Sequence, residues 1–235
     1  ITEKHLKTDP ENIFLARSTR MRFPAENVRD HILASSGVLN EEIGNYVFKK
    51  EDFHIVNGVP EALQKLKKQG KCRFIGMTGY PLGCLKKALE ACVLDVCISY
   101  CHCTLLDQSM LSELVPIAER RGTGIINASP LAMGALTLNP PAWHPAPEEV
   151  KQAAMKAAQY CKSQGSDLSL LAMQWVLSQE KVATTLVGMS KLSELQLNLK
   201  ALESGPDPML LNEVQKILSP VQGRCWHSGL WAPEA

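Results

Sequence analysis

From Val59 onward, short apolar runs alternate with amphipathic segments, and this alternation limits the fold more than any other feature. Glycines follow three of the expected helices, at residues 70, 122 and 165, which is where helices commonly end. The pattern predicts strands at residues 73–78, 96–100, 124–127 and 183–187, and helices at residues 59–69, 82–91, 109–121, 147–164, 169–177, 193–201 and 209–218. Strand followed by helix, repeated with short connections, predicts parallel βαβ units in an α/β protein. Because the strands are almost continuously apolar, we expect both faces of the sheet to be buried.

The length and charge of the chain exclude several classes of protein. With 235 residues and a net charge of +1, the chain can bury one core, but it is shorter than the about 250 residues of a complete eight-unit barrel. The balanced charge and the lack of an apolar run near the roughly 20 residues that cross a bilayer predict neither nucleic acid nor a membrane as partner. The eight cysteines are scattered along the chain, which is typical of reduced thiols in a cytoplasmic protein. The oligomeric state stays open.

The most informative local segment runs from Gly124 to Thr137. A short apolar strand stops at Ser129-Pro130, a loop of small residues follows, and a proline-rich stretch at residues 139–147 leads to the next helix. In parallel β/α proteins, ligands bind at loops that follow the carboxyl ends of strands. We therefore expect Ser129 to offer a free hydroxyl and a free backbone N–H to a ligand. The alternative is an ordinary turn, because Ser-Pro after a strand is common in turns.

Three such units occur in order, at residues 71–82, 124–137 and 184–191. Together they resemble the C-terminal half of an aldo-keto reductase, and the Pro-Pro-Ala-Trp-His-Pro-Ala-Pro loop is similar to that of the L-galactose dehydrogenase-like branch. The resemblance covers residues 59–202. It implies a (β/α)8 TIM-barrel fold that is incomplete at the N-terminal side. Residues 1–58 would then be a divergent remnant of the early barrel units, and residues 203–235 a C-terminal helix and tail.

The resemblance also implies a dinucleotide cofactor whose nicotinamide end meets three strands. Thr78 matches the polar residue that holds the carboxamide in the family, and Ser99 matches a second carboxamide contact that is usually a glutamine. Ala128 stands where an aromatic ring normally stacks on the nicotinamide, so we expect that stacking contact to be lost.

For the rest of the cofactor, the resemblance assigns eight residues. Those matching the loop over the pyrophosphate are Ser129, Pro130 and Leu131, and those whose backbone matches the loop facing the adenosine phosphate are Gly188, Met189 and Ser190. Asn198 matches the adenine contact. Glu194 stands where NADP-specific members carry an arginine, and its carboxylate would repel a 2′-phosphate, so we expect NAD to be preferred over NADP. The alternative is that Glu194 only stabilises the start of its helix.

The catalytic residues of the family cannot be assembled from this sequence. The chemistry requires a tyrosine acid, a lysine–aspartate pair and a histidine. The region expected to carry the aspartate and tyrosine is absent, Ser18 or Thr19 occupies the place of the lysine, and residues 46–50 contain no histidine. We interpret the nearby His54 as a surface residue. The sequence therefore predicts no catalytic residue.

A metal site is a second possibility that the residue pattern disfavours. Cys97, Cys101, His102 and Cys103 are close in sequence, but neighbours on a strand point to opposite faces and cannot form a tetrahedral zinc site alone. We interpret these cysteines as buried and expect no metal. We expect His144 to be an exposed loop histidine rather than a group that approaches a substrate hydroxyl.

Three functions are consistent with the sequence. The first is an NAD(P)-dependent oxidoreductase acting on a sugar or small carbonyl compound, inactive in this 235-residue form. The second is a catalytically dead relative that binds a nucleotide or a protein partner, and the third is a β/α protein with a different chemistry. In a sheet without its remaining strands, we also expect Ile75, Ile98 and Ile126 to be incompletely covered and the chain to self-associate.

Overall fold

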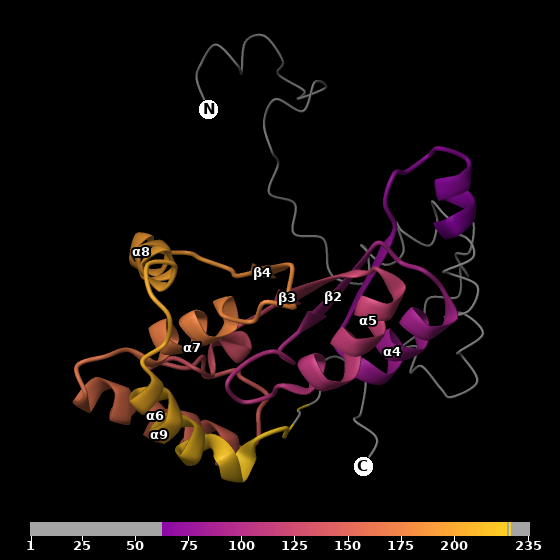
Figure 1. Ribbon diagram of the computed structural model, residues 1–235. Coiled ribbons are helices and arrows are strands. Elements are labelled where there is room, and N and C mark those ends of the chain that lie inside the picture. Colours follow the sequence, from indigo (N-terminus) through magenta and orange to yellow (C-terminus); the bar gives the residue numbers. More distant parts are fainter. Residues whose placement is uncertain (1–62, 225, 227–235) are drawn as a thin grey trace, which may run out of the picture. The chain divides into compact units, whose positions relative to one another are not determined.

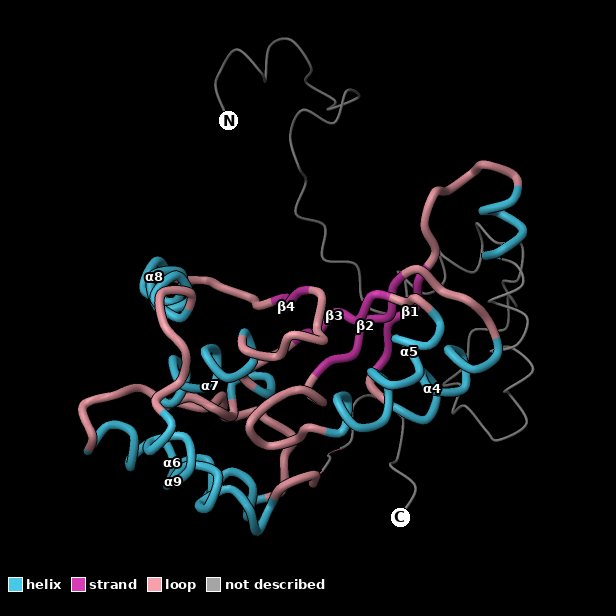
Figure 2. The backbone as a smooth tube through the Cα atoms, in the orientation of Figure 1, coloured by secondary structure: helices cyan, strands magenta, loops and turns pink. Residues whose placement is uncertain are grey.

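The computed structural model describes residues 63–224 and 226, all within the unit Tyr46–Ala235 (Figures 1 and 2). The expected N-terminal segment, residues 1–58, lies outside the described residues. The chain continues from a helix at residues 63–68 through these elements: β1 (Gly76–Gly79), α4 (Leu82–Ala91), β2 (Val96–Tyr100), η2 (Met110–Leu114), α5 (Val115–Arg121), β3 (Gly124–Ala128), η3 (Ala132–Gly134), α6 (Glu148–Ser163), α7 (Leu168–Leu177), β4 (Thr184–Leu186), α8 (Leu192–Ala201), α9 (Pro208–Leu218) and η4 (Ser219–Val221).

The four strands form one parallel sheet in the order β1-β2-β3-β4 (Figure 2). Each strand therefore pairs with the strand that follows it in sequence, and helices make every crossover, as in a (β/α)8 barrel. The predicted bounds of α4 and β2 are confirmed, and the described part of the chain is a segment of the predicted α/β fold.

The first strand is shorter than predicted, because it begins at Gly76 rather than at residue 73. The ladder starts where Gly76 pairs with Val96, so residues 73–75 extend beyond the beginning of β2. The Ile75 N–H donates instead to the Asp95 carboxylate, at 2.8 Å. This carboxylate is also bound by Lys67 at 2.6 Å. The Asp95 side chain thus accepts the hydrogen bond of the backbone N–H that lies just before the start of the ladder.

The helix predicted at residues 109–121 is two helices. A π-helical turn, η2, precedes α5, and Pro116 stands in the first turn of α5. Proline has no N–H to donate and its ring crowds the carbonyl four residues earlier, so a regular α-helix cannot run through it. The helix then ends at Gly122 with a φ of 67°, and the Gly122 N–H donates to Ala118 and Glu119. This left-handed conformation favours glycine.

The two faces of the sheet differ, contrary to the prediction that both are buried. Cys97, Ser99, Ile125 and Asn127 alternate along β2 and β3 and are all buried. They share a face with Gly79, whose missing Cβ would meet Leu85 of α4, so this face is the one that the helices cover.

The opposite face is less covered. Ile98 and Ile126, which pair across the strands, are only partly buried, as expected. Ile75 belongs to the buried core, so its predicted exposure is wrong. Within the described residues, one face of the sheet is therefore fully covered and the other is partly exposed.

The C-terminal segment contributes to the core. Helix α9 lies beside α6 (Figure 1), and Val214 and Leu218 are fully buried. Beyond α9, Trp226 is also buried, and its backbone N–H donates to the Tyr80 hydroxyl at 3.3 Å. A helix was predicted from residue 209, and it begins one residue earlier at Pro208, with Asp207 accepting the first N–H groups. Among the described residues, we find no helix long and apolar enough to span a membrane.

Candidate functional site

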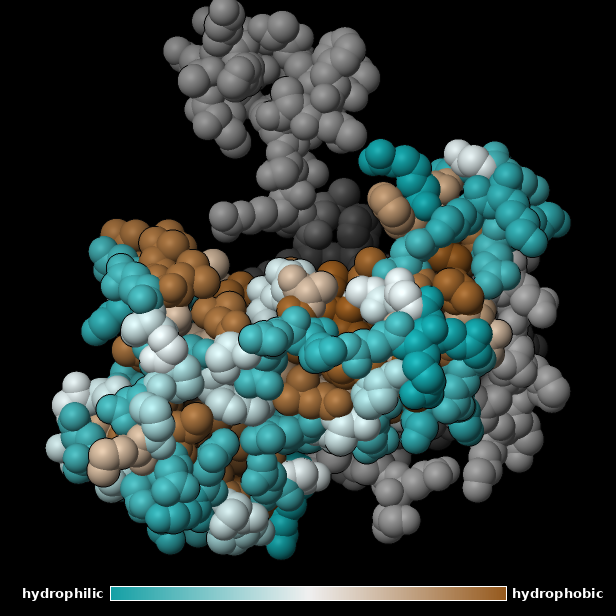
Figure 3. Space-filling view, viewed as in Figure 1, coloured by the Kyte–Doolittle hydropathy of each residue, from teal (hydrophilic) through white to brown (hydrophobic). Residues whose placement is uncertain are grey.

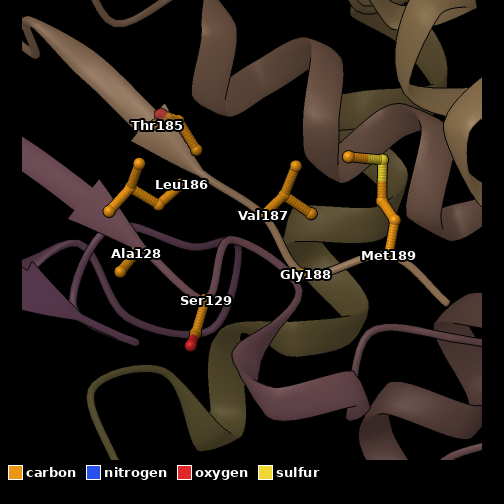
Figure 4. Close-up of a pocket in the computed structure, with 7 residues that line it drawn as sticks. All are labelled: Ala128, Ser129, Thr185, Leu186, Val187, Gly188 and Met189. Carbon is orange, nitrogen blue, oxygen red and sulfur yellow. The ribbon is translucent and has the colours of Figure 1, made fainter. Parts of the chain in front are cut away.

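A pocket of about 540 Å³ lies at the carboxyl ends of β3 and β4 (Figure 4). Parallel pairing brings these strand ends together, with Ala128 opposite Leu186. The residues that line the pocket are Ala128, Ser129, Thr185, Leu186, Val187, Gly188 and Met189. Four residues that were predicted to contact the cofactor therefore meet in one place: Ala128 and Ser129 at the end of β3, and Gly188 and Met189 after β4.

The backbone beside this pocket is strained. Cys101 and Ser129, each directly after the last residue of its strand, have positive φ angles of 66° and 55°. Ala132 and Met133 have φ angles of 49° and 56°. Left-handed conformations are uncommon outside glycine and cost on the order of 1–3 kcal/mol each, and such residues cluster at functional sites. Their position at the carboxyl ends of β2 and β3 supports a ligand site there.

The Ser129 hydroxyl is close enough to the Cys101 thiol to lower the pKa of that thiol, against the larger opposite effect of burial. Figure 4 shows the hydroxyl pointing away from the side chains of Val187 and Met189. The Cys101 N–H donates to the Ala128 carbonyl at 3.0 Å. Burial raises the pKa of the Cys101 thiol to about 12. Cys101 therefore stays a neutral thiol that ties the two loops together.

The other two residues of this loop lie beside the pocket lining. Pro130 is buried and Leu131 is partly buried. The Leu131 carbonyl accepts from Gly134 at 2.9 Å and Leu136 at 3.2 Å, which closes the turn through η3. Pro130 and Leu131 are thus part of the turn that connects the pocket lining to η3.

The start of α8 forms the other side of the site. Gly188 faces open space, since a Cβ there would meet no atom within 4 Å. The Glu194 carboxylate accepts from the backbone N–H of Ser190 at 2.7 Å and of Lys191 at 3.2 Å. These N–H groups, that of Ser190 first, lower the pKa of Glu194. Through these two hydrogen bonds, Glu194 stabilises the start of α8. Asn198 lies one turn further along and is partly buried.

On the nicotinamide side, the structure does not bring the predicted pair together. Thr78 is exposed and pairs with Ile98, whereas Ser99 pairs with Gly79 and Asn127 on the face covered by helices. Ser99 is completely buried, and within the described part of the chain its hydroxyl has no hydrogen-bond partner. A shift of one residue along a strand reverses the face. Alternate residues of a strand share a face, so Ile98, two residues before Tyr100, lies on the same face of the sheet as Thr78 and Ala128. Ile98, and not Ser99, is therefore the β2 residue beside Thr78.

A buried polar network around His102 was missed by sequence reasoning. His102 Nε2 lies 2.7 Å from the Tyr80 carbonyl, and Nδ1 lies 2.8 Å from Asp107 Oδ2. The Ser109 hydroxyl donates to Asp107 Oδ1 at 2.5 Å. Burial alone would raise the pKa of Asp107, but the hydrogen bonds from His102 and Ser109 outweigh it and lower the pKa.

The partners of His102 hold its ring between two loops. A carboxylate can only accept hydrogen bonds, so Nδ1 carries a proton toward Asp107. The result is a buried histidine–carboxylate pair. It joins the loop after β1, through Tyr80, to the loop after β2 at the end of the sheet where the pocket opens.

His144 is buried, so the expectation of an exposed loop histidine is wrong. Its Nε2 lies 2.8 Å from the Ala132 carbonyl, and the Ala146 N–H donates to Nδ1 at 3.1 Å. One nitrogen donates and the other accepts, which requires the neutral ring. His144 fixes the proline-rich loop against η3, and it makes an edge contact with the Trp226 ring at 5.0 Å between centroids.

The cysteines are buried, as predicted. Cys97, Cys101 and Cys103 are free thiols that are 2% exposed or less. Because β2 ends at Tyr100, the expected alternation of Cys101, His102 and Cys103 along a strand does not occur. In the residues that the structure describes, no group of histidine, cysteine, aspartate or glutamate side chains is arranged to hold a metal ion.

Comparison with known proteins places this arrangement in a family. The model of the Aldo/keto reductase family matches residues 18–218. The chain belongs to this family. L-galactose dehydrogenase of Arabidopsis thaliana is 45% identical over 184 residues, which cover 75% of this chain and 57% of that protein. D-arabinose 1-dehydrogenase of Saccharomyces cerevisiae is 28% identical over 193 residues, covering 73% and 58%. The chain thus spans little more than half the length of these relatives.

Solved structures support the same fold. An aldo-keto reductase from Bacillus halodurans in its holo form aligns with a TM-score of 0.53 at 20% identity, covering 73% of this chain and 58% of that chain. A glycerol dehydrogenase from Gluconobacter oxydans gives 0.52 at 18% identity, covering 75% and 58%. The four parallel strands are therefore part of an aldo-keto reductase barrel.

The expected loss of the aldo-keto reductase catalytic residues cannot be followed in the structure. Ser18, Thr19, residues 46–50 and His54 all lie outside the described residues. The site described above is the part of an aldo-keto reductase that follows its fifth to eighth strands by resemblance, and it contains the residues matched to cofactor binding.

Proposed function

We propose that residues 59–202 form the cofactor-binding half of a sugar dehydrogenase of the aldo-keto reductase family. We further propose that the 235-residue chain binds a nicotinamide dinucleotide but does not transfer hydride. The observation that carries the proposal is the pocket, because residues matched to the cofactor from two separate segments meet there. The names of L-galactose dehydrogenase and D-arabinose 1-dehydrogenase favour a sugar as the substrate class.

The residues present fit part of such a cofactor. A volume of about 540 Å³ falls within the range of about 300–1,000 Å³ usual for small-molecule sites. Ala128 adds little bulk, and Gly188 leaves the backbone open to a close approach. Ala128 and Ser129 would border one side of the ligand, and Gly188, Met189 and Ser190 the other. When bound, a nicotinamide dinucleotide supplies the hydride acceptor, and these residues would only hold and orient it.

Glu194 supports NAD over NADP. Its carboxylate is held against the Ser190 and Lys191 N–H groups at the start of α8, where helix N–H groups would otherwise attract an anion. A phosphate at this place would meet a negative charge and N–H groups that are already bonded. The 2′-hydroxyl of NAD carries no charge and avoids this repulsion.

The proposed lack of hydride transfer rests on the missing acid. Without a positioned phenol or other acid, the substrate oxygen must carry the charge that develops during hydride transfer, and such an acid is commonly worth about 10²–10⁴ in rate. The pocket also favours a second candidate function, a nucleotide-binding module without catalysis. In this second case, no sugar would bind beside the dinucleotide.

The test is a titration of the full chain with NAD+ and NADP+ by calorimetry. We expect saturable NAD+ binding that weakens at least tenfold in Gly188→Asp, which places a carboxylate in the pocket. The matched control is Gly205→Asp, at a glycine that also faces open space but lies outside the pocket, and it should bind NAD+ like the unmodified chain. Equal losses in both variants would contradict the assigned site.

Turnover is measured in parallel. With NAD+ and L-galactose or D-arabinose, we expect no dehydrogenation above the uncatalysed background. Steady NADH production at enzymatic rates would overturn the proposed inactivity and leave the binding proposal intact.

A further inference from the structure

The last residues of the strands form a row that contains an aromatic ring not used by the proposed function. Tyr100 ends β2 and is the register partner of Ala128 in β3, and Ala128 is in turn the partner of Leu186 in β4. Ala128 and Leu186 both line the pocket. We infer that the Tyr100 ring stacks on the nicotinamide ring of the bound dinucleotide, an inference that rests on the cofactor site proposed above.

Tyr100 belongs to the face of the sheet that carries the pocket residue Ala128. Register partners in neighbouring strands lie side by side, and alternate residues of one strand share a face. Tyr100 therefore shares a face with Ala128 and with Thr78, the partner of Ile98. Neighbouring strands are about 5 Å apart, a distance that a tyrosine side chain can cross. The ring thus borders the space next to Ala128.

A nicotinamide ring is flat and aromatic, so a second flat ring is a favourable surface for it. Ala128 offers only its methyl group there (Figure 4). With the adenosine end beside Glu194 of α8, as proposed above, the nicotinamide end extends across β3 toward β2. Within the four described strands, Tyr100 is the one aromatic residue.

The Tyr100 ring is held in place by a second tyrosine. It lies against the Tyr80 ring, with centroids 5.1 Å apart and planes tilted by 37°. Tyr80 is 6% exposed, and its ring also contacts the His102 ring at 4.8 Å between centroids. Its hydroxyl accepts from the Trp226 backbone N–H. Tyr100 itself is only partly buried. A ring that is fixed before binding loses little conformational freedom when a ligand arrives, so Tyr80 and His102 act as positioning residues for Tyr100.

The experiment is a calorimetric titration of the full 235-residue chain with NAD+ and with ADP-ribose, which lacks the nicotinamide ring. We expect Tyr100→Ala to weaken NAD+ binding about 10-fold or more, as for the loss of one stacking ring, and to leave ADP-ribose binding unchanged. Tyr100→Phe keeps the ring and should bind both ligands like the unmodified chain. The matched control is Tyr160→Ala, which removes a partly buried tyrosine ring from α6 and should change neither affinity.

Proton NMR of NAD+ with the unmodified chain gives a measurement that does not depend on how a variant folds. A stacked aromatic ring shifts the nicotinamide proton signals upfield, and we expect this shift with the unmodified chain and with Tyr100→Phe.

Four results would overturn the inference while NAD+ still binds. They are the absence of the upfield shift, an unchanged NAD+ affinity in Tyr100→Ala, an equal loss of NAD+ and ADP-ribose binding in that variant, and a loss in Tyr100→Phe as large as in Tyr100→Ala. An unmodified chain that binds neither ligand would instead contradict the proposed function, and this inference with it.

Discussion

Helices α4 and α8 have the same leucine spacing but differ in how far their leucines are buried. Each has ten residues, and each follows a strand at one edge of the same sheet. In α4, Leu85, Ala88 and Leu89 are completely buried, whereas Leu192, Leu195 and Leu199 of α8 are 70%, 40% and 54% exposed (Figure 3). Leucine spacing therefore predicts a helix and an apolar face in both cases, but what covers that face depends on neighbours elsewhere in the chain or on another molecule.

We expect the largest loss of stability from changes in the buried network of His102, Asp107 and Ser109. This network holds the Tyr80 carbonyl in the loop before α4. Asp107→Asn removes the buried carboxylate that accepts from His102 Nδ1, the Ser109 hydroxyl and the Ser109 N–H. Hydrogen bonds to a charged group contribute about 1.5–3 kcal/mol each, so we expect the free energy of unfolding in urea at pH 7 to fall by at least about 3 kcal/mol. Ser109→Ala removes the bond from the hydroxyl but keeps the carboxylate, and it should cost clearly less, about 1–3 kcal/mol. Equal or negligible losses would contradict the role of the carboxylate in this network.

The same network sets an acid limit. Folding lowers the pKa of Asp107, so the unfolded chain takes up this proton more readily than the folded one. The stabilisation is complete above the unfolded carboxyl pKa of about 3.9 and disappears as the pH falls through the lower folded value. We expect the free energy of unfolding to drop below about pH 4 in the unmodified chain and to vary less there in Asp107→Asn.

A direct pair of leucine substitutions separates the two helices. Leu89→Ala in α4 opens a cavity in a closed core and should destabilise the chain by about 2–5 kcal/mol. Leu199→Ala in α8, at a side chain that is 54% exposed, should change stability by no more than about 0.5 kcal/mol. Denaturation of both variants under identical conditions checks the difference. Similar losses would mean that α8 is covered within one chain.

The smallest effect is expected at the start of α8. Glu194→Gln keeps a side-chain oxygen that can accept from Ser190 and Lys191 but removes the charge. We expect the ratio of NADP+ to NAD+ affinity to rise about two- to fivefold, as for an exposed charge pair, with thermal stability unchanged. In Glu194→Ala, which loses the hydrogen bonds too, the melting temperature should fall. An unchanged affinity ratio in both variants would show that the carboxylate does not influence the bound nucleotide.

Much of the fold was predictable because its signals are local. The bounds of α4 and β2 and the glycine end of α5 follow from periodicity and helix termini. The resemblance, not the periodicity, assigned Ala128 and Gly188 to the cofactor, and both line the same pocket. The side-chain directions were harder to predict. The resemblance matched Ser99 to the same cofactor group as Thr78, but the register pairs Thr78 with Ile98 and puts Ser99 on the other face. The register between two strands is not visible in the sequence of either strand.

The polar networks depend on contacts distant in sequence. His102 meets the Tyr80 carbonyl across 22 residues, and His144 bonds a carbonyl of the preceding loop. No periodic pattern encodes such contacts, so one histidine was considered only for a metal site and the other was expected at the surface. The spacing His102–Asp107–Ser109 was the available signal, since a histidine near an aspartate and a serine can form a hydrogen-bonded turn.

Hydrogen exchange measured by mass spectrometry, with and without saturating NAD+, tests the central claim most directly. The account predicts slower exchange in peptides that contain residues 128–131 and 187–191, with no change in the already buried α4. Protection confined to other segments, or no protection at NAD+ concentrations up to the millimolar range, would contradict a cofactor site at the carboxyl ends of β3 and β4.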